Sequence, residues 1–392
     1  MNPHPAIPPA EFPQRWRRVQ EMMARQRLDL LVAYADARAV FGPAHARWLA
    51  NFPVHFEPAC ILMPRRGDPV LLTGPESVAY ALLAGQMRDV RAASVFVHPD
   101  EDYPFATIHS LTDILAELAG GAGAIRRVGL AGRGLMSADF LAGFRLALPE
   151  AEWIDVEEAM CDLRARKSPA EIAVIRHAYG IAGLGLQAAV GAIAVGVSER
   201  EVAAEAEAAM RRAGAEGTGI DTIVASGPNA RPILARSTFR RIRPDELVLL
   251  TLAPRYEGYH AAIGRPVLVG NPGDDIRGAA EVAGRAQEAC YRALRAGVEG
   301  REVEAIGRRI VAEAGLAPYF LYSGVHSVGV IEFEPPIFGP SSAAVIEPDM
   351  IISVDIPLFD APWGGLRVED GYRIGADGVE RLNQAPYLIT IE

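Results

Sequence analysis

The chain has 392 residues, of which 50% are apolar and 22% are charged, and its formal net charge is −10. A single hydrophobic core seldom grows beyond about 250–300 residues, so this length predicts two domains. The negative net charge argues against a general role in binding nucleic acid or anionic lipid, because both of these partners bind to dense positive patches on a protein.

The start of the chain lacks the charged-then-apolar order of a signal peptide, and no run of about 18 uncharged apolar residues follows it. We therefore expect a cytoplasmic protein that does not enter a membrane. Cys60, Cys161 and Cys290 are too scattered for a metal knuckle and odd in number for a disulfide framework. They are expected to be small buried hydrophobic residues in a reducing compartment.

The first part of the chain alternates strand-like and helical segments. Helical patterns cover residues 12–27 and 104–120. This alternation predicts an α/β domain, which we bound at residues 1–160. The expected strands are residues 28–34, 59–64, 69–74, 93–98 and 126–132.

A helix start marks the second domain, which we place at residues 161–392. Ser168 is suited to cap a helix, and Pro169 fits its first turn. Glu171, three residues after the cap, completes a capping box.

The second domain repeats a theme of helices followed by strands. This succession predicts an α+β domain and suggests an internal pseudo-repeat. The expected helices are residues 198–213, 275–297 and 301–315, and the expected strands lie near residues 219–225, 246–253, 259–269, 327–333, 350–355, 366–374 and 386–391.

Three of these strands carry polar residues. His326 is expected to share a sheet face with Val328 and Val330, and the alternation extends to Glu332. Asp355 closes an apolar strand, and Glu369 lies inside another. A carboxylate in a buried strand is costly unless it is paired or ligated. These strands therefore either pass an active cleft or contain a local ion pair.

The order of segments resembles the creatinase / aminopeptidase P / prolidase family. The resemblance implies a C-terminal pita-bread catalytic domain of the α+β class, preceded by a creatinase-like α/β domain, and usually a homodimer. The segments that carry it are WLANFP at 48–53, the helix start at 167–176, SGPNARP at 226–232, the hairpin at 249–270, GVHSVGV at 324–330, the strand to Asp355, and GGLRVED at 364–370.

Peptidases of that family hold two metal ions with two Asp, one His and two Glu. The positions that match the two Asp are Thr251 and Ala262, whereas His326, Asp355 and Glu369 match the other three. Two dications need several anionic oxygen donors, so a dinuclear site should not form here. We expect no metal and no cofactor. A mononuclear site from the three remaining residues, which has the composition of a facial triad, is the alternative.

Two further His positions of the family's peptidases are occupied here by Leu234 and by Phe333, the second of them just before Glu334. Creatinase keeps the His at the position of Leu234 and has a Glu at the position of Gly264, and these two departures oppose creatine as the substrate. The metal-free branch of the family, creatinase, is nevertheless similar in its Ala at the second Asp position.

A metal-free mechanism assigns His326 as the general acid or base, since its unperturbed pKa lies near neutrality. Glu369 and Asp355 would orient it or bind a cationic substrate group. Desolvation can also raise the pKa of one carboxylate and supply a second proton carrier.

Several residues are candidates for substrate binding. Strand alternation lets only one of Tyr259 and His260 face the cleft. An arginine here either binds a substrate carboxylate or is a structural ion-pair partner. The loop-like segment 45–58 either leans over the partner subunit's active site, as in the family's dimers, or forms a hydrophobic cluster. The substrate-binding candidates are His260, Tyr259, Thr251, Arg236, Arg367, Glu334, His55 and Phe56.

These features predict a metal-independent, creatinase-like hydrolase that cleaves a C–N bond of a small nitrogen-containing substrate. One alternative is an Xaa-Pro dipeptidase-like or aminopeptidase-like metallohydrolase with a reduced metal site. The other is a catalytically silent pita-bread module that binds peptides or partners. The expected partners are a small molecule and a second copy of the chain, with no nucleic acid and no membrane.

Overall fold

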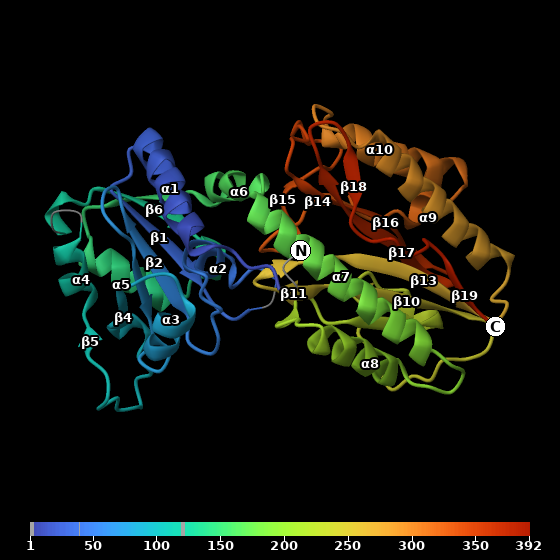
Figure 1. The fold of residues 1–392 in the computed structure, drawn as a ribbon, viewed down its shortest axis with the longest axis horizontal. Coiled ribbons are helices and arrows are strands. Elements are labelled where there is room, and N and C mark those ends of the chain that lie inside the picture. Colours follow the sequence, from blue (N-terminus) through green and yellow to red (C-terminus); the bar gives the residue numbers. More distant parts are fainter. Residues whose placement is uncertain (1–3, 39, 119–121) are drawn as a thin grey trace. The chain divides into compact units, whose positions relative to one another are not determined.

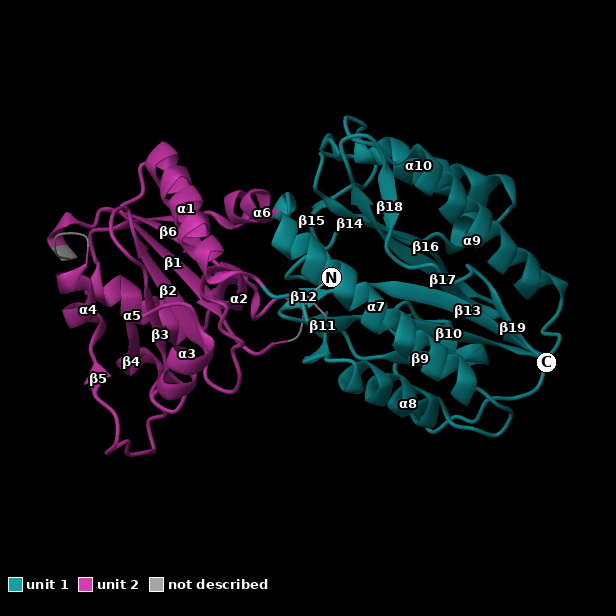
Figure 2. Ribbon diagram, in the orientation of Figure 1, with its two compact units in different colours: residues 1–6, 165–392 teal, residues 7–164 magenta. Residues whose placement is uncertain are grey.

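A computed structural model describes residues 4–38, 40–118 and 122–392. The chain folds into two compact units (Figure 2). One is Ile7–Arg164, and the other comprises Ala165–Glu392 with the described part of residues 1–6. The division falls at the end of a helix, a few residues beyond the boundary at residue 160 that the sequence suggested.

The unit Ile7–Arg164 is built on a seven-stranded mixed sheet in the order β5-β4-β3-β2-β1-β6-β7. Strands β1, β2 and β3 pair antiparallel, and the outer strands on both sides pair parallel. The strands are β1 Leu30–Ala35, β2 Ala59–Pro64, β3 Val70–Thr73, β4 Val90–Ala93, β5 Ile108–His109, β6 Arg127–Ala131 and β7 Glu152–Asp155. The helices are α1 Phe12–Gln26, α2 Ala44–Ala50, α3 Val78–Ala84, α4 Leu111–Glu117, α5 Ala138–Ala147 and α6 Glu157–Ala165.

Three expectations for this unit were wrong in detail. The strand expected at 93–98 ends at Ala93, because Val95 and Phe96 turn away in a 3-10 helix and pack on the core beside α5. Part of the loop-like segment 45–58 is helix α2, which tertiary packing buries. The helix expected at 104–120 is reduced to α4, and residues 119–121 lie outside the described residues.

The second unit contains, in its described residues, a nine-stranded sheet with the central order β15-β14-β16-β17-β13-β10-β9, and a small sheet β12-β11-β8. Its strands are β8 Gly217–Thr218, β9 Ile223–Ser226, β10 Glu246–Leu252, β11 Pro254–Tyr256, β12 Tyr259–His260, β13 Ile263–Val269, β14 Val325–Ser327, β15 Glu334–Ile337, β16 Ile351–Ala361, β17 Gly364–Ile374, β18 Val379–Arg381 and β19 Ile389–Ile391. Its helices are α7 Pro169–Ala192, α8 Glu199–Arg212, α9 Asp274–Ala293 and α10 Gly300–Glu313.

Helix α7 begins as its sequence predicts. The Glu171 backbone N–H donates to Ser168 Oγ at 3.1 Å, and the Ser168 N–H donates to Glu171 Oε2 at 2.7 Å. Pro169 occupies the first turn. The predicted capping box is therefore confirmed. No helix in the described ranges is long and apolar enough to span a bilayer.

The helices of this unit pack as two pairs, α7 with α8 and α9 with α10 (Figure 1). The core under α9 and α10 takes alternate side chains of β16 and β17, including Val354, Ile356, Val368 and Tyr372. Because successive strand residues point to opposite faces of a sheet, the intervening residues of β16 and β17 lie on the face away from this core. That face carries the polar residues expected at the site.

Two strand boundaries differ from expectation near those polar residues. Strand β14 ends at Ser327, and residues 328–333 turn before β15, so the continuous strand expected at 327–333 was wrong. Strand β16 runs to Ala361 because it forms a long hairpin with β17. Asp355 therefore lies inside its strand and does not close it.

Candidate active site

Four strands align the polar positions in one row. Thr251 on β10 pairs with Gly264 on β13, Gly264 pairs with Glu369 on β17, and Glu369 pairs with Asp355 on β16. Directly opposed residues of antiparallel strands project from the same face of a sheet. The register therefore brings together residues that lie more than a hundred positions apart in the chain.

His326 joins this row from β14. It pairs with Ser353, two residues before Asp355, and its Nε2 lies 3.8 Å from Glu369 Oε1. Its Nδ1 lies 2.9 Å from the Ser327 carbonyl oxygen, which only accepts, so Nδ1 carries a proton. Burial alone would lower the pKa of His326, but the contact with Glu369 and nearby negative charge raise it.

Glu369 is a carboxylate of the cluster whose pKa is lowered. Ser353 Oγ donates to Glu369 Oε1 at 2.8 Å. Burial alone would raise the pKa of Glu369, but the contact with His326 and the charge of Arg367 bring it below its usual value. This carboxylate is therefore suited to orient His326 and to stabilise the imidazolium.

Glu332 is a site residue that the sequence-based selection missed. Single ligand atoms of His326, Glu332 and Glu369 all lie within 4.8 Å of one another. The turn at 328–333 returns Glu332 to His326, and burial beside the Glu369 charge raises its pKa to about 7. The sequence signal that could have identified Glu332 was strand alternation, which placed it on the same face as His326.

Asp355 lies between a tyrosine and an arginine. The Tyr322 hydroxyl donates to Asp355 Oδ2, and Arg367 Nε lies 3.7 Å from the same oxygen. Burial raises the pKa of Asp355 to about 6, although the charge of Arg367 opposes the shift. Tyr322 had no sequence signal that linked it to this carboxylate.

Arg367 is buried among the carboxylates. Its Nη1 lies 3.9 Å from Glu369 Oε2, and its guanidinium lies 5.2 Å from the Phe359 ring centroid. A Cβ added at Gly264 would lie 2.5 Å from Arg367 Cγ, so the glycine makes room for the arginine. Of the two roles considered for Arg367, the geometry favours the ion-pair partner.

The donor set does not fit the family's two metal ions. Thr251 is buried and neutral, and Ala262 offers no side-chain oxygen. His326, Glu332 and Glu369 remain as one imidazole and two carboxylates, which is a set for one ion at most. The candidate one-ion set thus contains Glu332 in the place where we had expected Asp355.

Tyr259 and His260 are neighbours on β12, and their side chains point in opposite directions, as strand alternation requires. The Tyr259 hydroxyl donates to Glu171 Oε1 at 2.7 Å, which ties it to α7. His260 points the other way: a Cβ added at Gly219 would lie 2.6 Å from His260 Cδ2 and 3.2 Å from Glu332 Cβ. Burial lowers the pKa of His260 to about 3, so it is neutral. His260 is the one that adjoins the site.

Glu334 has a structural partner. Lys167 Nζ lies 3.2 Å from Glu334 Oε1, and the same ammonium donates to Ser327 Oγ at 3.0 Å. Both charged side chains are buried. This ion pair anchors the start of α7 to the β14–β15 turn.

The structure does not bring the other candidates into the buried cluster. Arg236 forms an exposed ion pair with Asp221 at 2.9 Å, and Leu234 is 73% exposed. His55 and Phe56 are exposed residues of the other unit. Their proposed contact across a dimer, and the dimer itself, stay predictions.

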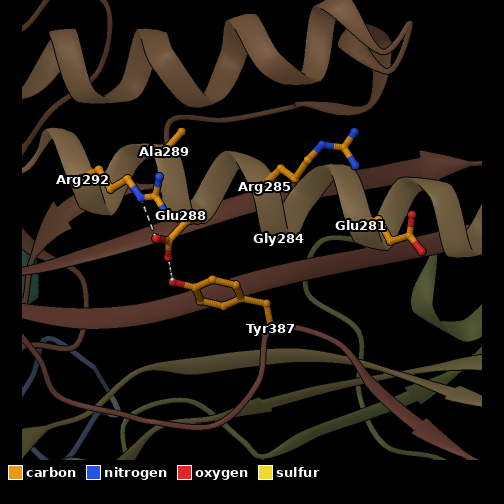
Figure 3. A pocket seen from close by; sticks show the side chains of 7 residues that line it. All are labelled: Glu281, Gly284, Arg285, Glu288, Ala289, Arg292 and Tyr387. Carbon is orange, nitrogen blue, oxygen red and sulfur yellow. Dashed lines mark hydrogen bonds and ion pairs between the residues drawn. The ribbon is translucent and has the colours of Figure 1, made fainter.

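A surface pocket of about 600 Å³ lies along α9 (Figure 3). Glu288 accepts from Arg292 Nε at 2.8 Å and from the Tyr387 hydroxyl at 3.2 Å there. None of the predicted site residues lines this pocket.

Comparisons with known proteins identify both parts of the chain. The model described as metallopeptidase family M24 matches residues 173–376, and the creatinase/prolidase N-terminal domain model matches residues 15–166. The chain is 32% identical over 251 residues to an Xaa-Pro dipeptidase from Pyrococcus furiosus, covering 64% of this chain and 72% of that protein.

Solved structures agree with these matches. The Xaa-Pro dipeptidase from Bacillus anthracis superimposes with a TM-score of 0.81 at 24% identity, covering 97% of this chain and 100% of that chain. The prolidase from Pyrococcus horikoshii OT3 gives a TM-score of 0.79 at 24% identity, covering 95% and 98%. The predicted family resemblance and the two-domain pita-bread fold of the α+β class are confirmed.

Proposed function

The chain belongs to metallopeptidase family M24 and is a hydrolase, and from that premise we propose that it cleaves a C–N bond of a small nitrogen-containing substrate without using a metal ion. One observation carries this proposal. The row across β10, β13, β17 and β16 keeps Glu369 and Asp355 beside His326, but it presents Thr251 where an anionic ligand would be required.

The chemistry needs one group that accepts a proton from water and another that donates one to the leaving nitrogen. Glu332, with a pKa raised to about 7, is suited to accept the proton as water attacks the carbon. The raised pKa of His326 keeps its imidazolium available to protonate the nitrogen as the C–N bond breaks. Glu369 holds that imidazolium in place.

The test is a screen of the purified protein against small amides, guanidino compounds and Xaa-Pro dipeptides in the presence of EDTA. We expect turnover that survives chelation and falls by about 100-fold or more in His326→Ala, since general acid–base groups contribute about 10²–10⁴-fold. His98→Ala, which removes an exposed histidine of the other unit, is the matched control. Turnover that is unchanged in His326→Ala would reject the catalytic assignment.

A one-ion Xaa-Pro dipeptidase is the second candidate, and two observations favour it. The atoms of His326, Glu332 and Glu369 converge within 4.8 Å, and the matched relatives include Xaa-Pro dipeptidases. A stoichiometric ion that restores Xaa-Pro dipeptide hydrolysis after chelation would establish this candidate and displace the first.

A further inference from the structure

The unit Ile7–Arg164 contains a pocket of its own. Its volume of about 410 Å³ falls within the range of about 300–1,000 Å³ that small-molecule sites occupy. Three aromatic side chains form one part of its lining: the Phe140 ring centroid lies 4.9 Å from that of Tyr34 and 5.4 Å from that of Phe96. Tyr34 belongs to β1 and Phe140 to α5, and both are buried. This part of the pocket is therefore a preformed aromatic surface.

The lining of this pocket carries an excess of negative charge. Glu57 and Glu101 line it, whereas no lysine or arginine does among the described residues. The Tyr103 hydroxyl donates to Glu101 Oε2 at 2.7 Å, and this hydrogen bond orients the exposed carboxylate. Within the described ranges, neither carboxylate forms an ion pair. Two negative charges beside aromatic rings favour a positively charged ligand, since the faces of such rings also attract cations.

Glu57 is held in its position by the backbone around it. Only 7% of this residue is exposed, and its carboxylate accepts from the Ser77 N–H at 2.7 Å and from the Glu76 N–H at 3.4 Å. A Cβ added at Gly74 would lie 2.1 Å from Glu57 Cδ, so the glycine makes room for the carboxylate. A carboxylate has about four lone-pair sites, and two hydrogen bonds leave capacity for the N–H groups of a ligand. A buried charge without a counter-charge is costly, and a cationic ligand would supply one.

Phe56 lines the same pocket in an unfavourable conformation. Its φ is 62°, in the left-handed region that a bulky side chain rarely adopts, and the residue is 82% exposed. An exposed phenylalanine gains little from burial, so its own packing does not offset the backbone strain. Such strain gathers at ligand sites. A ligand cation over the Phe56 ring would give this conformation a use.

We propose that this pocket binds an organic cation, a primary ammonium on an apolar body, with the ammonium paired with the carboxylates of the lining and the apolar body against the rings of Tyr34, Phe96 and Phe140. An ammonium that carries N–H groups fits the free lone pairs of Glu57 better than a quaternary one, which has none to donate. The site uses no residue of the catalytic cluster, so this inference goes beyond the proposed function and does not depend on it.

The test is calorimetric titration of the full-length protein with 2-phenylethylamine, 2-phenylethanol and 3-phenylpropionate, which share a body and differ in charge. We expect saturable binding of the amine, at least about tenfold tighter than that of the alcohol or the acid. Glu57→Gln and Glu101→Gln should each weaken binding of the amine and spare that of the alcohol. Phe56→Leu should weaken the amine about two- to fivefold. The matched controls are Glu150→Gln and Phe105→Leu, which change exposed residues outside the pocket.

Two results would overturn the proposal at once: no saturable binding of the amine, or equal affinity for the amine and the alcohol. A third variant separates this pocket from the catalytic carboxylates. Glu369→Gln should leave the binding unchanged; an amine that Glu369→Gln releases while Glu57→Gln retains it would be bound at the catalytic cluster, and the proposal would fail. If Glu57→Gln does not fold, the exposed Glu101→Gln decides. A protein that binds the amine but shows no turnover would refute the proposed function and support this inference.

Discussion

The buried Lys167–Glu334 ion pair gives a quantitative test of the site's framework. Its two side chains are 1% and 0% exposed, and Lys167 Nζ also donates to Ser327 Oγ at 3.0 Å and to the Ala165 carbonyl at 3.1 Å. Lys167→Met removes the cation and leaves Glu334 buried. Removing one partner of such a pair costs about 3–5 kcal/mol. We expect that loss in the free energy of unfolding.

Equilibrium urea denaturation measures the effect. The double variant Lys167→Met/Glu334→Gln removes both charges, so it should be less destabilised than Lys167→Met alone. The exposed pair Arg309–Glu313, at 4.0 Å, is the control, and Arg309→Met should cost less than about 1 kcal/mol. Single variants within about 1 kcal/mol of wild type, or a double variant that equals the sum of the singles, would refute the reasoning and return Glu334 to substrate binding.

Three further predictions concern individual residues. The pKa of Glu332 is raised from 4.5 to about 7 in the fold, so this group contributes stability that is full below pH 4.5 and is lost as pH rises through about 7. In Glu332→Gln, the free energy of unfolding should therefore depend less on pH over that range, and the rise of turnover near pH 7 should disappear. Gly264→Ala should lower the unfolding free energy by about 1–3 kcal/mol through overpacking against Arg367, whereas Gly180→Ala, at a position with open space, should not destabilise; thermal melts compare them. Ser168→Ala should cost about 1 kcal/mol in urea denaturation through loss of the α7 cap, and an unchanged midpoint would contradict it.

The sequence predicted correctly those elements that depend on contacts between residues close together in the chain. The capping box at Ser168 and Glu171 is a contact between residues three positions apart, and α7 begins there. Errors arose where distant packing decides the outcome. Val95 and Phe96 were expected in a strand, but they lie in a 3-10 helix and pack against the core beside α5.

The sequence by itself determined which acids are missing: position 251 holds threonine and position 262 holds alanine, and no folding changes the number of anionic oxygens. Only the tertiary structure decided what stands beside the remaining ones. Glu332 reaches His326 because a turn interrupts the strand, and Arg367 reaches Asp355 because two strands pair in one register. Register and turns bring together residues from different strands, and a pattern of neighbours along the chain does not specify those distances.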